Sequence, residues 1–97
     1  MRFNDYIMNE LKIACSHYPI KYLGIFGSYA RGEQKPGSDL DLIVEFNDKI
    51  SLLDLVHIQN DLKDKLHIEI DLHTRKSISK YMIHDIEHEV VTVYEEQ

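Results

Sequence analysis

Residues 20–46 read IKYLGIFGSYARGEQKPGSDLDLIVEF, and this stretch decides the fold. It opens with a short run of apolar, β-forming residues over 20–26, which predicts a buried strand. Gly27-Ser28 follows directly, and Pro36-Gly37 marks a turn further on. Residues 39–46 then alternate, with two aspartates on one side and Leu, Leu, Val and Phe on the other. That period of two predicts a second strand built into a core.

The flanking sequence adds helices and a further strand. Apolar side chains at helical spacing indicate one helix before the stretch and another after it, and Ser51 and Asp54 can start the second with a capping box. The β-branched run at 90–94 either prolongs the last helix or forms a short edge strand. We expect helices near 3–15, 52–65 and 77–89, a helical turn at 29–33, and strands at 20–26, 39–46 and 67–73. This order predicts a single α/β (α+β) domain over residues 1–97, with helices packed on one small mixed sheet.

Composition narrows the function classes. Eleven Lys and Arg stand against seventeen Asp and Glu, a net charge of −6. A protein that binds nucleic acid mainly through its phosphates needs a basic surface, so direct nucleic-acid binding is not expected. No apolar run approaches the ~20 residues of a membrane helix, and the first residues lack the pattern of a signal peptide. Cys15 is the one cysteine and is expected to be buried. We expect a cytoplasmic protein with no membrane partner.

The Gly27-Ser28 pair is a candidate anion site. A glycine has no Cβ, so the backbone can pass close to another group there. Ser28 brings a hydroxyl and an N–H group to the expected start of a helical turn, where anions are favoured. Arg31 lies one turn further along, and a guanidinium matches phosphate geometry with two parallel hydrogen bonds. Alternatively, Arg31 is structural and pairs with Glu33 or Asp39.

Asp39 and Asp41 are a candidate ion site. Two residues apart on a strand, they project from one face about 6–7 Å apart at the backbone. Mg²⁺ is commonly held by one or two carboxylates together with substrate phosphates. Asp71 can reach the same face from the third strand, where it could bind a second ion or accept a proton. The plainer alternative is that the two aspartates form the solvated face of a strand.

Residues 20–46 resemble the core motif of the minimal nucleotidyltransferases, which belong to the DNA polymerase β-like nucleotidyltransferase superfamily. That pattern is a strand, Gly-Ser, and then Asp-x-Asp on the next strand. The matching positions are Gly27, Ser28, Ala30, Arg31, Gly32, Ser38, Asp39 and Asp41. A later Ile-Asp-Leu context in the family is matched by residues 70–72, with Glu69 as a second candidate for the third acid. The resemblance implies the nucleotidyltransferase fold.

The resemblance also implies an activity. It is transfer of a nucleoside monophosphate, AMP from ATP, to an acceptor hydroxyl, with Mg²⁺ as cofactor. Gly27, Ser28, Arg31 and Ser38 would bind the nucleotide, and Asp39, Asp41 and Asp71 would be the catalytic and metal-binding acids. Stand-alone chains of this kind resemble the antitoxins of HEPN–MNT toxin–antitoxin pairs, so the expected acceptor is a tyrosine of a cognate HEPN toxin. The alternative is a binding module of the same fold that neutralises its toxin by forming a complex.

Two further histidine patterns are interpreted without a catalytic role. His84 and His88 lie one helical turn apart in a His-x-x-Glu-His pattern typical of inverted zinc proteases. A catalytic zinc needs a third protein ligand, so we interpret this pair as a polar helix face. His73 shares the alternation of Asp71 and so lies on the same face, where it could support the site residues; we expect instead a partly exposed histidine at a strand end.

Overall fold

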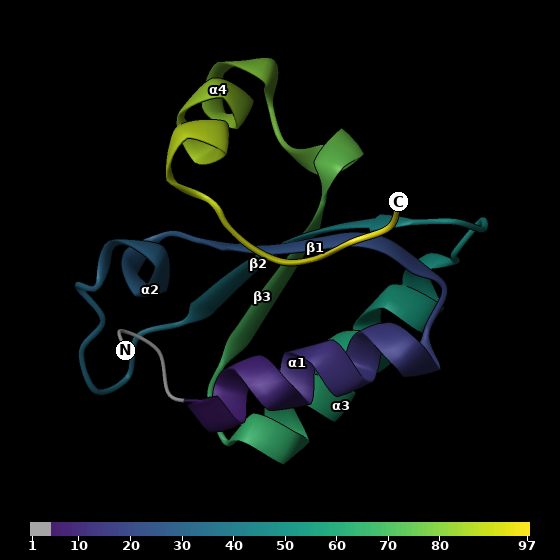
Figure 1. Ribbon diagram of the computed structural model, residues 1–97, viewed down its shortest axis with the longest axis horizontal. Coiled ribbons are helices and arrows are strands. Elements are labelled where there is room, and N and C mark those ends of the chain that lie inside the picture. The colour runs from purple at the N-terminus through teal and green to yellow at the C-terminus, as the bar shows by residue number, and fades with distance from the viewer. Residues whose placement is uncertain (1–4) are drawn as a thin grey trace.

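The computed structural model describes residues 5–97 and contains one four-stranded sheet with helices on both faces (Figure 1). The start of the first helix predicted at residue 3 lies outside the described residues. The mixed α/β architecture predicted from the sequence is confirmed. The elements in chain order are α1 (Asp5–His17), β1 (Ile20–Phe26), α2 (Ser28–Arg31), β2 (Leu40–Phe46), α3 (Leu52–Leu66), β3 (Ile70–Thr74), the 3₁₀ turn η1 (Arg75–Ser77), α4 (Lys80–Glu89) and β4 (Val91–Glu95).

The strands lie in the order β3-β2-β1-β4. β1 is antiparallel to both β2 and β4, whereas β2 and β3 are parallel and are connected by α3. A parallel pair needs such a crossover, and a helix is its usual form. In the parallel register Asp41 pairs with Asp71 and Leu42 pairs with Leu72. The two aspartates therefore lie side by side on one face of the sheet.

The sheet is covered on both faces. Helices α1 and α3 pack against one face of the sheet (Figure 1). Leu11, Leu42 and Leu62 in this layer are at most 1% exposed. Helix α4 covers the central part of the other face through Ile86, which belongs to a smaller cluster with Ile43. Ile43 is an apolar residue on the same side of β2 as Asp41. It is buried there because α4 covers this part of the face, whereas the rest of the face stays open to solvent.

The capping box predicted for α3 is confirmed. The Asp54 N–H donates to the Ser51 hydroxyl at 3.1 Å, and the Ser51 N–H donates to the Asp54 carboxylate at 3.3 Å. At its other end α3 is capped by His67, which adopts a left-handed conformation with a φ of 57°. The N–H of His67 donates to the carbonyl of Lys63 at 2.8 Å. The strand predicted at 67–73 is therefore wrong for its first three residues, because a left-handed residue cannot continue an extended strand.

Smaller corrections concern the ends of other elements. α1 continues to His17, and β2 begins at Leu40, so Asp39 precedes the strand. The last helix begins at Lys80 rather than at residue 77, because η1 intervenes and the Ser79 side chain caps α4. The β-branched run after α4 is an edge strand that pairs with β1. Among residues 5–97, no helix combines the length and apolar character needed to cross a membrane.

Candidate active site

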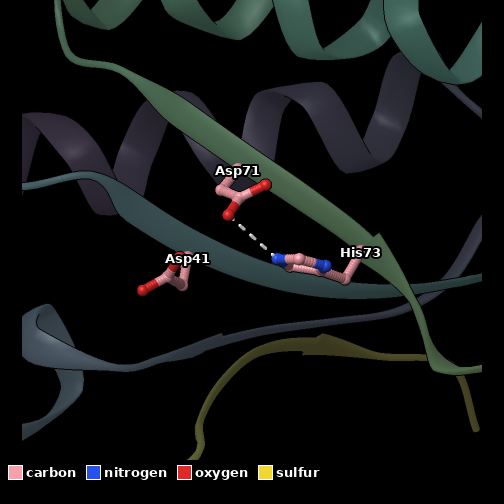
Figure 2. Close-up of side chains that lie close together, drawn as sticks. All are labelled: Asp41, Asp71 and His73. Atoms are coloured by element: carbon pink, nitrogen blue, oxygen red, sulfur yellow. Dashed lines mark ion pairs between the residues drawn. The ribbon is translucent and has the colours of Figure 1, made fainter. Parts of the chain in front are cut away.

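Three side chains from β2 and β3 converge on one face of the sheet (Figure 2). Asp41, Asp71 and His73 each offer a ligand atom, and these atoms all lie within 4.8 Å of one another. Asp71 Oδ2 lies 3.1 Å from His73 Nε2. The convergence follows from the parallel register, which pairs Asp41 with Asp71, and from the period of two, which returns His73 to the same face.

The electrostatics of this cluster favour a cation. The pKa of Asp41 is raised above its ordinary value, first by burial and then by the negative charge of Asp71, with a smaller contribution from Asp39. His73 and Arg31 act in the opposite direction. Two carboxylates and an imidazole are ligands that divalent cations accept in proteins, and an ion between them would relieve this repulsion. The donor set therefore fits a divalent metal.

The other two acids proposed from the sequence lie differently. Asp39 is exposed and precedes β2, and it is not among the three residues that converge. Its charge still acts on Asp41. Glu69 lies before β3 and forms an ion pair with Lys63 at 2.9 Å. Of the two candidates for the third acid, Asp71 is thus the one beside Asp41.

Gly27 lies directly against Asp41. It has a φ of 74° and a ψ of −153°, a conformation that residues with a Cβ rarely adopt. A Cβ at this position would collide with Asp41 Oδ2. The Gly27 N–H donates to Glu89 Oε2 at 2.6 Å. Glycine is therefore required here both for the backbone conformation and for the close approach to the carboxylate.

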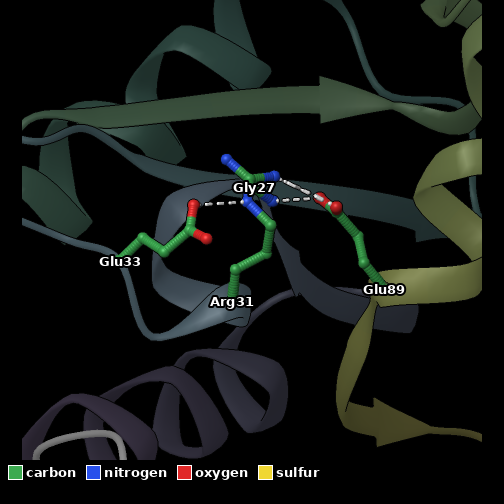
Figure 3. A network of polar contacts seen from close by, with 4 residues as sticks. All are labelled: Gly27, Arg31, Glu33 and Glu89. Atoms are coloured by element: carbon green, nitrogen blue, oxygen red, sulfur yellow. Dashed lines mark hydrogen bonds and ion pairs between the residues drawn. The ribbon is translucent and has the colours of Figure 1, made fainter.

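Arg31 is held between two glutamates (Figure 3). Its Nε donates to Glu33 Oε1 at 2.9 Å, and one terminal nitrogen donates to both oxygens of Glu89 at 3.1 and 3.3 Å. The pairing with Glu33 was one of the sequence alternatives. Sequence reasoning missed Glu89, which is 58 residues from Arg31 in the chain. Its only signal would have been a carboxylate at the end of the last helix.

The two serines take part in local backbone structure. Ser28 begins α2, and its carbonyl accepts a hydrogen bond from the N–H of Glu33 at 2.9 Å. The Ser38 hydroxyl accepts from the N–H of Lys35 at 2.8 Å, and the Ser38 N–H donates back to the carbonyl of Lys35 at 2.9 Å. Ser38 thus closes the turn before Asp39. α2 spans Ser28–Arg31, where the sequence predicted a helical turn at 29–33, and a helix of four residues has only a weak dipole to attract an anion.

The histidine pair on α4 is a separate feature. His84 Nε2 and His88 Nε2 lie 3.2 Å apart, and both residues are exposed. Over residues 5–97, the Asp41–Asp71–His73 group is the one set of at least three such side chains with metal-ligating proximity. The exposure of both histidines agrees with their interpretation as a polar helix face.

Comparison with known proteins identifies the class. The family model described as "Nucleotidyltransferase domain" matches residues 7–93, and the chain belongs to this family. A protein of Methanocaldococcus jannaschii, provisionally named a protein adenylyltransferase, is 42% identical over 90 residues, which are 92% of each chain.

Solved structures share the fold. One chain of a crystal structure of a toxin–antitoxin with AMP-PNP superposes with a TM-score of 0.82 at 21% identity, covering 93% of this chain and 74% of that one. A chain from a complex of tri-AMPylated Shewanella oneidensis HEPN toxin with MNT antitoxin gives a TM-score of 0.75 at 16% identity, covering 98% and 73%. At these identities the likeness establishes the nucleotidyltransferase fold.

Proposed function

We propose that this protein transfers AMP from ATP to a hydroxyl group of a partner protein. The observation that carries the proposal is that a candidate anion-binding group lies directly against a candidate metal-binding group. The N–H of Gly27 donates to the carboxylate of Glu89, and Gly27 itself packs against Asp41, which belongs to the metal-ligating group. A triphosphate bound at Gly27 would thus have its phosphate oxygens beside a bound cation, which is the arrangement that phosphoryl transfer needs.

Each site residue has a proposed role. The Gly27 N–H, Ser28 and Arg31 bind the β- and γ-phosphates, and Ser38 supports the loop on which Asp39 enters the site. Asp41 and Asp71 would hold Mg²⁺, with Asp39 as a further ligand or as a charge that strengthens the site. Mg²⁺, when bound, offsets the charge of the phosphate oxygens.

The transfer forms one bond to phosphorus and breaks one, and the proton of the acceptor hydroxyl passes to a base. The acceptor oxygen attacks the α-phosphorus of ATP in line, the bond from that phosphorus to the bridging oxygen of the β-phosphate breaks, and pyrophosphate leaves. Asp71 orients the acceptor hydroxyl and takes its proton. His73, 3.1 Å from Asp71, holds that carboxylate in place. Most of the rate enhancement comes from positioning and charge neutralisation.

The proposed acceptor is a tyrosine of a cognate HEPN-type toxin, so that the protein acts as an antitoxin. Two findings support it. The similar M. jannaschii protein carries a protein adenylyltransferase name, and a chain of the same fold occurs in a complex with an AMPylated HEPN toxin. The net charge of −6 also suits a basic protein partner better than a nucleic acid. The cytoplasmic location and the single domain over residues 1–97 remain predictions.

The test is modification of the protein's genomic neighbour. The purified pair is incubated with ATP and Mg²⁺, and the intact mass of the neighbour is measured. We expect additions of about 329 Da per AMP, as required by AMP less water in this phosphoryl transfer, and we expect Asp41→Ala to abolish them.

Asp64→Asn is the matched control, because it removes one exposed carboxylate from α3 on the opposite face of the sheet. It should modify the neighbour like the parent. An unmodified neighbour that still forms a tight complex would support the alternative, a binding module without transfer activity. Labelling of a tRNA end in place of the neighbour would contradict a protein acceptor.

A further inference from the structure

The N–H of Gly27 and the guanidinium of Arg31 form an anion-binding cradle, and the carboxylate of Glu89 occupies it. Glu89 is the last residue of α4, and its two oxygens accept hydrogen bonds from the Gly27 N–H at 2.6 Å and from the guanidinium of Arg31 at 3.1 and 3.3 Å (Figure 3). These are the same donors that the proposed function gives to the triphosphate. The cradle is therefore filled by an anion of the protein's own.

A carboxylate and a phosphate compete for such donors. The carboxylate is planar and the phosphate is tetrahedral, but the anionic oxygens of both accept charge-assisted hydrogen bonds from backbone N–H groups and arginine. The Gly27 N–H points at Glu89 and has one hydrogen to donate. A phosphate oxygen that takes this hydrogen must displace the glutamate or bind beside two like charges, Glu89 and Asp41.

The surroundings allow the exchange. The Glu89 side chain is 26% exposed and that of Arg31 is 46% exposed, so neither is locked into the core. A pocket of about 400 Å³ adjoins them, lined on the α4 side by Met82, Asp85 and Ile86. Glu89 is the last residue of α4 and lines this pocket, so its side chain has open space beside it to move into when it releases the two donors.

We propose that Glu89 is a built-in competitor for the phosphate subsite. In the free protein it occupies the Gly27 N–H and neutralises Arg31. On nucleotide binding it leaves both donors to a phosphate. Glu89 thereby lowers the affinity for phosphate compounds and reserves the cradle for ligands with several phosphates, whose further contacts offset the displacement. This inference rests on the proposed function for the identity of the ligand, but not for the competition itself.

The test measures anion affinity after the competitor is removed. Glu89→Gln keeps the shape of the side chain and removes its charge, and Glu89→Ala removes both. Calorimetry with inorganic tripolyphosphate in the absence of metal, at constant ionic strength, should show about tenfold tighter binding by Glu89→Ala, since a hydrogen bond to a charged group opposes the ligand in the parent. Glu89→Gln should show a smaller gain, because its amide oxygen can still accept from Gly27.

Glu33→Gln is the matched control. It removes one carboxylate from the same guanidinium but makes no contact with the Gly27 N–H. Its affinity should change by less than about twofold, as expected for an exposed ion pair. An equal gain in this control would overturn the proposal in favour of a general charge effect. Unchanged or weaker binding by both Glu89 variants would overturn it too and would make Glu89 a positioning residue for Arg31.

A second measurement needs no variant. The amide resonance of Gly27 reports its hydrogen bond, and tripolyphosphate should shift it together with the side-chain resonances of Glu89 in the parent protein. A shift of Gly27 without any change at Glu89 would contradict displacement. Because tripolyphosphate needs neither metal nor acceptor, these outcomes are independent of whether AMP transfer is observed.

Discussion

Asp41→Asn should make the protein more stable while removing its function. In the folded chain Asp41 is partly buried, and Asp71 lies opposite it on the neighbouring strand. Like charges directly opposite one another on adjacent strands are destabilising, and one such cross-strand pair is worth about 0.2–1 kcal/mol. Asparagine keeps the shape beside Gly27 and removes the charge. For a domain of this size we expect the melting temperature to rise by roughly 1–8 °C near pH 8.

The pH dependence of this gain follows from the direction of the pKa. The folded state raises the pKa of Asp41 above its ordinary value of 3.8, chiefly by burial and by the charge of Asp71. Between the unfolded and folded pKa values the folded state binds more protons, so the parent loses stability as the pH rises through that window. The penalty is complete above the folded pKa and absent below the unfolded one. The advantage of Asp41→Asn should therefore disappear towards pH 3.

Thermal unfolding followed by circular dichroism between pH 3 and pH 8 measures this difference. Asp64→Asn, on the opposite face, should leave the melting temperature within about 2 °C of the parent, as is usual for surface substitutions. The reasoning is refuted if Asp41→Asn melts below the parent at pH 8, or if its advantage is the same at pH 3 as at pH 8.

Three further predictions test other parts of the structure. Gly27→Ala should cost roughly 1–3 kcal/mol of stability in chemical denaturation, because alanine is strained at this φ and its Cβ collides with Asp41; wild-type stability would contradict the described backbone. Ser51→Ala should cost about 1 kcal/mol by removing the α3 capping box, and ATP affinity should stay unchanged. Burial raises the pKa of the Cys15 thiol to about 11, so a thiol reagent at pH 8 should label the native protein far more slowly than the denatured protein; equal rates would show that Cys15 is accessible.

Local patterns in the sequence predicted much of the fold. The strand over residues 20–26 and the capping box of α3 were confirmed because each depends on neighbouring residues alone. The third strand was misplaced at its start because residues 67–69 continue the period of two seen at 70–73. The sequence contains no sign that His67 adopts a left-handed conformation to close α3.

The candidate site was predictable to the extent that it follows strand alternation. Asp71 beside Asp41 required only parallel pairing in the right register, and the family resemblance supplied the motif. The partner of Arg31 was not predictable in the same way. Glu89 reaches it from the end of the last helix, and only the packing of α4 on the sheet brings the two together. Long-range polar contacts of this kind depend on tertiary structure and leave no periodic trace.

The register of β2 and β3 couples the packing on one face of the sheet to the position of the carboxylates on the other. The same pairing that aligns Leu42 with Leu72 under α1 and α3 aligns Asp41 with Asp71 on the other side. The apolar core therefore sets the separation of the carboxylates from the opposite face of the sheet. Misplacement of a reacting group by about 1 Å can cost a hundredfold in rate. Random mutagenesis screened for activity should accordingly recover buried leucines of these strands alongside the acids, and volume-conserving pairs of changes there should restore what single changes lose.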